Sequence, residues 1–488
     1  VNEVTGLVSY GAYNTNAKGD IDFPENSFNT PGFRLDTEKD GNQIGEDQDF
    51  DGGSVKVAVN YGVELGEGGY ANFTTEYISK NKTLRPAYGF RRGFGEAAID
   101  GFNFMVNAAY PISDKSEIYA FGGRNYRDTD AFAFTRQNPT ARNILSIYPD
   151  GFTPRITSNI IDNSVSVGIR TELNNGWKAD ISNTFGKNYF HYFIKGTLNA
   201  SLEEASPTDF DAGGHSLSQN TINMDFSKYY EDVLEGMNLA FGAEYRTERF
   251  IIFAGEEASY GTYDTNGILI TDPANQTQPT VIIDGEETLR NGGSQGFPGY
   301  SPSNEVDRSR TNFSLYVDGE FDLSEAFLLS GAARFESYSD FGSTVNGKVA
   351  ARFKATDNIN IRGSVSTGFR APSLAQVYYN LRFTNFVGSE AVDQLLSPNN
   401  SPVTASFGIE RLKEEKALNA GLGFTGTFGN FTATVDGYLI NVNDRIVLTG
   451  TFETTDIPGV SAAQFFVNGV DTQTTGLDMV FSWRKNFD

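Results

Sequence analysis

Apolar and polar residues alternate along the segment 359–370, INIRGSVSTGFR. Ile361 and Val365 fall on odd positions, whereas Arg362 falls on an even one. Because successive side chains of a β-strand point to opposite faces, this pattern predicts a strand with one apolar face and one polar or cationic face. Pro372 follows and has no N–H to donate, so we expect the strand to end before it.

The same alternation recurs along most of the chain and predicts about sixteen strands. Gly, Asn and Asp occupy many of the short separations, as in 66–69 and 174–176, and are typical of tight hairpin turns. The clearest strands are expected at 4–13, 54–65, 70–79, 102–112, 117–134, 165–170, 177–181, 237–246, 313–321, 327–335, 345–353, 359–369, 418–428, 431–439 and 470–483.

Turns of about two to four residues alternate with connections of about fifteen to fifty, which are unusually long. One end of the sheet is therefore expected to have only short turns. The other end is expected to carry the long connections around Asn42, Pro139, Asn275 and Asn399. One apolar side and one charged side over many consecutive hairpins predict an all-β fold, a transmembrane antiparallel β-barrel with lipid outside and water inside. The alternative, a set of soluble sandwiches or a propeller, would need turns of similar length at both ends.

The alternation also assigns individual side chains to the two faces of the barrel. Lipid-facing positions are expected at Val317, Leu329, Val349 and Leu422. The wall of the lumen is expected to carry Arg334, Glu336, Arg352 and Arg362, together with Asp318.

Composition narrows the choice of function. The 488 residues have a net charge of −24, which disfavours nucleic acid as a partner because phosphate binding needs a basic face. The chain has no Cys, so it has neither a disulfide framework nor a thiolate site. No apolar run is long enough for a transmembrane helix. The acidic stretch 36–53 could hold a divalent cation, but it lacks calcium-loop spacing, and a solvated loop is the favoured interpretation.

Three segments resemble the TonB-dependent outer-membrane receptors. The first is TGFRAPS, formed by Thr367, Gly368, Phe369, Arg370, Ala371, Pro372 and Ser373. The second contains the pair Asp444 and Arg445, and the third contains Asn468, Gly469, Thr475, Gly476 and Asp478. Their order and spacing on alternating strands make the resemblance specific, and it covers most of the chain.

The resemblance implies a barrel of about twenty-two strands whose lumen is closed by an N-terminal plug. On that expectation, residues 1–488 form an incomplete outer-membrane β-barrel domain without the plug and the last strands. The implied partners are outer-membrane lipid, the protein's own plug domain, a TonB-type periplasmic energy-coupling protein and a nutrient such as a metal chelate. A passive sixteen-stranded porin is the alternative.

No catalytic constellation is visible, so we expect binding and gating and no enzyme activity. His191 and His215 have no partnering motif, and we expect no metal site and no cofactor. Some haem-importing members of the family carry a His after the Phe-Arg-Ala-Pro element. Residues 371–488 contain no His, which argues against haem as the substrate.

Aromatic residues and one cation are concentrated just after Pro372, in YYNLRFTNF. Such aromatics are typical of a membrane-interface girdle. Alternatively, they form a ligand-binding segment on an outer loop, made of Tyr378, Tyr379, Arg382, Phe383 and Phe386. The predicted function is an active-transport receptor in the outer membrane of a Gram-negative bacterium, which binds a scarce bulky nutrient such as a ferric siderophore and imports it with TonB-supplied energy.

Overall fold

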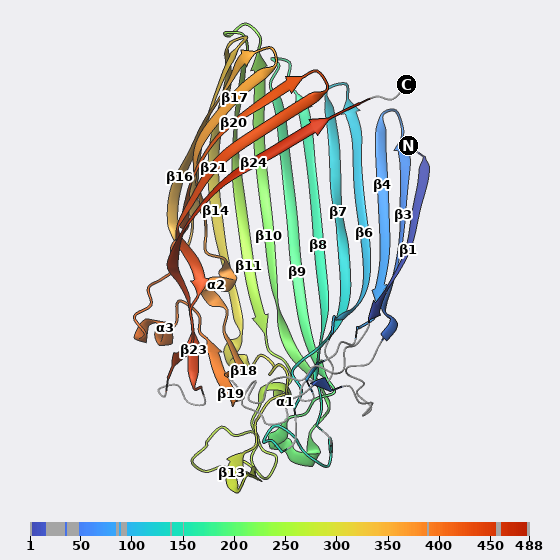
Figure 1. Cartoon of the computed structure of the whole chain (residues 1–488), viewed down its shortest axis with the longest axis vertical. Helices are drawn as coiled ribbons and strands as arrows, with labels where there is room; N and C mark the ends of the chain where they lie inside the picture. Colours follow the sequence, from blue (N-terminus) through green and yellow to red (C-terminus); the bar gives the residue numbers. More distant parts are fainter. Residues whose placement is uncertain are drawn as a thin grey trace.

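Sixteen strands form one continuous sheet in the computed structural model (Figure 1). The structure describes residues 2–15, 35–36, 48–83, 87–88, 95–136, 139–149, 151–387, 390–454 and 460–485. In sheet order, the strands are β1 (Glu3–Thr15), β3 (Gln48–Leu65), β4 (Gly69–Lys80), β6 (Ala98–Ser113), β7 (Ser116–Phe132), β8 (Arg155–Glu172), β9 (Lys178–Lys195), β10 (Asp209–Tyr230), β11 (Met237–Phe253), β14 (Val306–Ser324), β15 (Phe327–Tyr338), β16 (Gly342–Thr356), β17 (Ile359–Arg370), β20 (Glu415–Phe428), β21 (Phe431–Leu448) and β24 (Phe466–Trp483).

Every neighbouring pair in this sheet is antiparallel, and sheet order follows chain order. The predicted all-β architecture of about sixteen strands is therefore confirmed. Many strands run for 17 or 18 residues, longer than the roughly nine to eleven that cross a bilayer. Among the described residues, no helix has the length and apolarity needed to cross a membrane.

The connections at the two ends of the sheet differ in size, as the sequence predicts. Short turns close one end, and the connections that contain Pro139, Asn275 and Asn399 gather at the other (Figure 1). One turn on the long-connection side is also short, residues 339–341 between β15 and β16. Asn42 and most of the acidic stretch 36–53 lie outside the described residues.

Small elements occur within the long connections. They are the helices α1 (Glu257–Tyr260), α2 (Leu374–Tyr378) and α3 (Pro402–Ser406), the 3-10 turns Ala200–Ala205 and Pro302–Asn304, and the short strands β2 (Leu35–Asp36), β5 (Ala87–Tyr88), β12 (Thr280–Ile283), β13 (Glu286–Leu289), β18 (Leu381–Val387), β19 (Glu390–Leu396), β22 (Phe452–Glu453) and β23 (Ala462–Gln464). β18, β19, β23 and β22 form a separate four-stranded sheet.

Strand β10 is absent from the strands that the hydropathy pattern predicts. Ile222 and Met224 alternate as expected, but the same face continues with Ser218 and Ser216. A β-bulge between Asp211 and Gly214 then shifts the register. Polar residues on the outward face and the bulge together hide the period of two.

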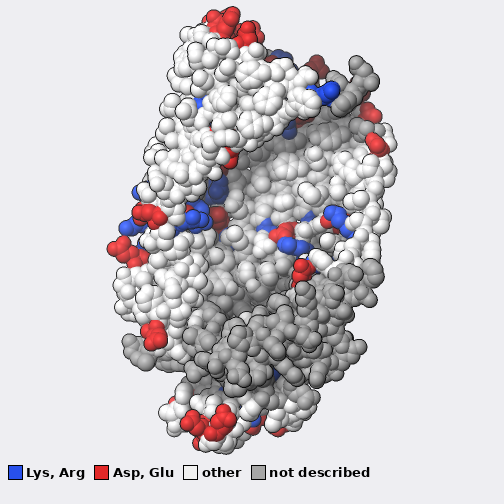
Figure 2. All heavy atoms as spheres, viewed as in Figure 1, with Lys and Arg blue, Asp and Glu red and all other residues white. Residues whose placement is uncertain are grey.

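The two faces of the sheet differ in chemistry. Val349 is 59% exposed and Leu422 is 68% exposed on the convex face, although both are large apolar residues. Charged side chains gather in the hollow on the other face (Figure 2). An apolar convex face and a charged hollow are the arrangement expected when lipid surrounds a sheet that encloses water.

Three tyrosines on the concave face explain why glycine occupies the facing position on a neighbouring strand. A Cβ at Gly168, Gly242 or Gly476 would overlap the ring of a tyrosine on a neighbouring strand. In two of these pairs the tyrosine hydroxyl continues to a carboxylate, with distances of 2.7 Å from Tyr119 to Asp180 and 2.6 Å from Tyr316 to Asp225. Glycine thus allows a large ring to lie flat on the wall.

The first testable prediction follows from the two faces. A charge on the lipid face near the bilayer midplane costs about 2–4 kcal/mol, whereas changes in the lumen are milder. Val349→Arg is therefore expected to reduce the amount of assembled sheet strongly, as measured by heat-modifiable gel mobility of membrane fractions. Arg352→Ala, three residues further along the same strand β16 and on its concave face, serves as the control and should assemble normally. Equal losses for both variants would contradict the assignment of faces.

Candidate functional site

The segment TGFRAPS ends β17 and fixes the chain as it leaves the sheet. Arg370 forms two hydrogen bonds with Glu415, the first residue of β20, from Nε at 2.9 Å and from Nη2 at 2.5 Å. Phe369 packs near the rings of Tyr338 and Phe341. A guanidinium and a carboxylate in this bidentate arrangement hold the ends of β17 and β20 in one orientation.

Glu415 also reaches the second motif. Its Oε1 accepts a hydrogen bond of 2.7 Å from the backbone N–H of Ile446, next to Asp444 and Arg445. The Glu415 side chain is only 8% exposed, so its charge is neutralised by these donors rather than by bulk water.

The third motif is tied to the second through Asn468. Its amide nitrogen donates to the carbonyl oxygens of Asp444 at 2.6 Å and Lys413 at 3.0 Å. Its side-chain oxygen accepts from the N–H of Lys413 at 2.8 Å. Asp444 lies at a register shift and has a positive φ of 55°, so its carbonyl needs a partner outside the regular ladder. Glu415 and Asn468 thus connect all three motifs.

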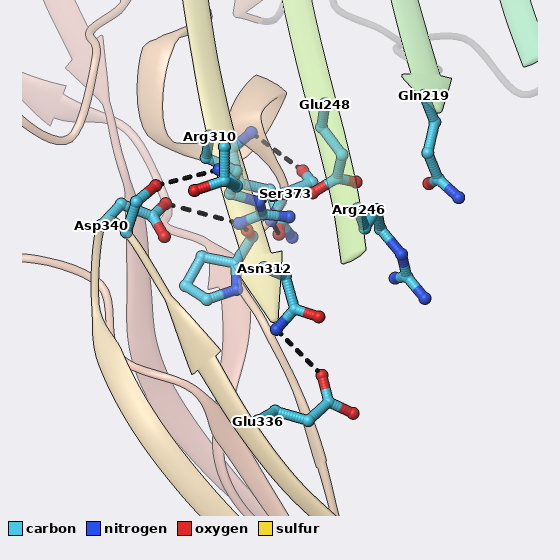
Figure 3. A network of polar contacts seen from close by, with 12 residues as sticks. Gln219, Arg246, Glu248, Arg310, Asn312, Glu336, Asp340 and Ser373 are labelled. Carbon is cyan, nitrogen blue, oxygen red and sulfur yellow. Dashed lines mark hydrogen bonds and ion pairs between the residues drawn. The ribbon is translucent and has the colours of Figure 1, made fainter. Parts of the chain in front are cut away.

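Beyond Pro372, a buried arginine holds the next turn. Arg310 lies between Glu248 and Asp340 and donates to the carbonyl oxygen of Pro372 at 2.6 Å (Figure 3). Its side chain is 6% exposed, and its Nε is 2.5 Å from the Glu248 carboxylate. Ser373 then begins α2 with a capping box, because its hydroxyl accepts from the N–H of Gln376 and the Gln376 side chain accepts from the N–H of Ser373.

An aromatic cluster anchors two outer connections to the concave face. Phe250 and Ile252 of β11 pack with Tyr300 and with Leu374 of α2, and all four are buried. The hydroxyls of Tyr300 and Tyr379 are 2.5 Å apart. Burial raises the pKa of both tyrosines, so both hydroxyls stay protonated and able to donate.

The predicted ligand-binding residues fall in different surroundings. Tyr378 and Tyr379 are half-buried against the aromatic cluster, whereas Arg382 is exposed on β18. The side chains of Phe383 and Phe386 lie outside the described residues. The structure therefore gives Tyr379 an anchoring position, whereas the Arg382 side chain is exposed to solvent.

The predicted lumen residues lie on the concave face. Arg334 bridges Glu336 at 2.6 Å and Glu244 at 3.3 Å. Glu336 also accepts a hydrogen bond from Asn312 (Figure 3). Farther along the sheet, Arg362 forms an ion pair with Asp436 at 2.6 Å. Arg352 is exposed and forms no ion pair with any described residue.

The sequence pattern does not single out Arg136 and Arg142, which are both buried in the connection between β7 and β8. Both donate to Oε1 of Gln295, which lies about 150 residues later, at 3.1 Å and 3.4 Å. Burial lowers the pKa of Arg136 to about 10, and the charge of Arg142 adds to this effect. No local period reveals such a contact, because both partners lie in irregular segments.

The two histidines contact a carboxylate and an aromatic ring. His191 Nε2 is 2.8 Å from Asp211, and His215 stacks on Phe190 with ring centroids 5.4 Å apart. Across the described part of the chain, no three His, Cys, Asp or Glu side chains are placed to hold a metal ion.

The second prediction concerns Glu415. Glu415→Gln removes the charge that Arg370 and Ile446 share and leaves the shape nearly unchanged. We expect a loss of about 1–3 kcal/mol from this junction, detected as faster proteolysis within 371–414 in the folded protein. Glu410→Gln is the matched control, because Glu410 lies in the same connection and forms an exposed pair with Lys413. Equal cleavage of Glu415→Gln and wild type would show that the junction does not depend on this carboxylate.

Known proteins with similar sequences or folds include transporters and receptors. The vitamin B12 transporter BtuB of Vibrio cholerae is 23% identical over 182 residues, which are 36% of this chain and 25% of that protein. The siderophore receptor PirA from Acinetobacter baumannii has a similar fold, with a TM-score of 0.60, 14% identity and coverage of 99% of this chain and 60% of that one. The RagAB peptide transporter gives a TM-score of 0.55 at 11% identity, covering 88% and 48%.

The chain thus spans a quarter of the length of the B12 transporter and about three-fifths of the siderophore receptor. The family model described as TonB dependent receptor-like, beta-barrel matches residues 103–488, which contain all three motifs. The chain belongs to the TonB-dependent receptor family, of which it contains β-barrel sequence.

Proposed function

We propose that this chain is the barrel part of an active-transport receptor in the outer membrane of a Gram-negative bacterium. The receptor binds a scarce bulky nutrient, such as a ferric siderophore, at the cell surface. A TonB-type periplasmic protein supplies the energy for import, and a plug domain closes the lumen. In this proposal residues 1–488 are an incomplete barrel domain, completed by further strands of the same protein.

The anchoring of the outer connections on the concave face carries the proposal. Tyr300 and Tyr379, from connections 254–305 and 371–414, meet over Phe250 and Ile252 of the inner wall. Side chains from two connections therefore lie over the concave wall. A passive porin would be expected to keep an open polar pore, so this packing favours the receptor.

The outer connections are also held together, which supports ligand binding. Gln295 accepts from Arg136, and its carbonyl accepts from the Thr197 hydroxyl at 2.7 Å. The Asn199 side chain donates to the carbonyl oxygens of Ala258 and Gly261. A surface fixed by such contacts loses little conformational entropy when a ligand binds.

The third prediction tests active transport against passive diffusion. Cells with the full-length protein are expected to accumulate a labelled ferric siderophore from nanomolar solution, and a protonophore or deletion of the energy-coupling protein should abolish accumulation while surface binding persists. A matched strain without the receptor gives the background. Accumulation that survives both treatments, with steady conductance in planar bilayers, would favour the porin.

The fourth prediction concerns the segment 378–386, for which we propose direct contact with the nutrient. Arg382→Gln should weaken ligand binding by about ten- to a hundred-fold, since a hydrogen bond to a charged group contributes about 1.5–3 kcal/mol. Arg411→Gln removes the same charge from the same connection and is the control. Titration of the purified receptor with the transported ligand measures both affinities.

Tyr379→Phe separates anchoring from binding. It removes the hydroxyl that meets Tyr300 but keeps the ring in the cluster. We expect normal assembly, a connection more sensitive to protease, and little change in affinity for the ligand.

The Arg382→Gln variant has its own contradicting outcome. If Arg382→Gln and Arg411→Gln bind the ligand with equal affinity, residue 382 lies outside the ligand site and the girdle interpretation of the segment is favoured.

A further inference from the structure

A row of hydrogen-bond donors crosses four adjacent strands on the convex face. In the strand register, Arg124 of β7 lies opposite Asn163 of β8, Asn163 opposite Lys187 of β9, and Lys187 opposite Ser218 of β10. Directly opposed residues share one face of a sheet. Val165 and Phe185 are exposed on that same face one row away, so the four donors point outward with the apolar residues.

Two cations of this row have no carboxylate partner. Among the residues that the structure describes, neither Arg124 nor Lys187 forms an ion pair, and the Lys187 ammonium lies 5.9 Å from the centroid of the Tyr189 ring. Other outward-facing cations are neutralised: Arg155 pairs with Asp130 at 2.9 Å, and Arg249 pairs with Asp307 at 2.5 Å. Lys195 and Lys228 on the same face also form no ion pair with a described residue, but they lie near the ends of β9 and β10, so Arg124 and Lys187 are the cations of this face that lack a counter-charge beside the apolar rows.

The neighbouring rows place the cations near the outer boundary of the apolar belt. Toward the short turns lie Gly122, Val165 and Phe185, followed by Ala120, Val167 and the polar Asn183, and then by Ile118, Ile169 and Ile181. Toward the long connections lie Tyr126, Ile161 and Tyr189, and beyond them Asp128, Asn159 and His191. Tyrosine is enriched where hydrocarbon meets headgroups, so the long side chains of Arg124 and Lys187 can reach that level.

We propose that Arg124, Asn163, Lys187 and Ser218 bind the phosphate of an outer-leaflet glycolipid headgroup. The inference rests on the proposed outer-membrane location. Two strand spacings separate Arg124 from Lys187, about 10 Å between Cα atoms, a distance that both long side chains can span to meet one headgroup. A phosphate neutralises both cations where water is scarce, and the Asn163 amide and the Ser218 hydroxyl supply further donors.

The test compares lipid retained by the purified full-length receptor in native mass spectrometry. The probes are lipid A with its phosphates and the same lipid after chemical dephosphorylation. Wild type is expected to retain phosphorylated lipid A at least about tenfold better than the dephosphorylated form, and Arg124→Gln with Lys187→Gln should remove this preference. Arg127→Gln is the control, because Arg127 lies on the concave face of β7 and pairs with Asp162 at 3.0 Å.

Two results would overturn the proposal. One is equal retention of the two lipids by wild type, and the other is an unchanged preference in the double variant. Neither depends on transport, because the proposal expects the double variant to bind and import nutrient normally. Failure of the proposed function would instead appear as wild-type protein outside the outer-membrane fraction or without energy-dependent uptake.

Discussion

The carboxylate of Glu415 is the contact on which the arrangement of this chain's motifs depends. It accepts two hydrogen bonds from Arg370 and one from the Ile446 N–H, and so it joins β17, β20 and β21 at the end where the long connections begin. A carboxylate with so little exposure is stable only when its charge is matched by donors, and three are present. The junction therefore has one favourable arrangement.

The position of the outer connections follows from that junction. Once Arg370 is held, Pro372 lies where the buried Arg310 can donate to its carbonyl oxygen, and Ser373 can start α2. Helix α2 then directs Leu374 into the cluster with Phe250 and Tyr300. Each contact satisfies a polar group or buries apolar surface. The connection is thus directed back over the concave face, where a ligand arriving from outside would meet it.

Much of the fold could be predicted because a strand with two different faces has a strict period of two. In 359–370 every second residue except Gly368 is polar, and the observed strand β17 ends at Arg370, two residues before the proline. Strand β10 could not be found in this way, because its outward face changes from Met224 and Ile222 to serines and then meets a bulge. The period is informative only where one face stays apolar.

The candidate site was less predictable because its contacts join residues far apart in sequence. Tyr379 and Tyr300 are 79 positions apart, and Arg136 and Gln295 are 159 apart. Glu415 carries a weaker local signal, since it begins a strand whose register places it opposite Arg370. The contact between Glu415 and Arg370 can be recognised only once β17 is known to pair with β20, and a single sequence does not reveal that pairing.

Charged side chains on the two faces of the sheet lie in different surroundings. On the concave face, Arg310, Arg334 and Arg362 each meet a carboxylate of the same chain. This wall can therefore be built from charged residues without an external partner. On the convex face, the apolar environment makes an unmatched charge costly, and Arg155 and Arg249 are matched within the chain. Among the described residues, Arg124 and Lys187 have no such partner in the apolar belt, and a counter-ion from the surrounding lipid would supply the missing charge.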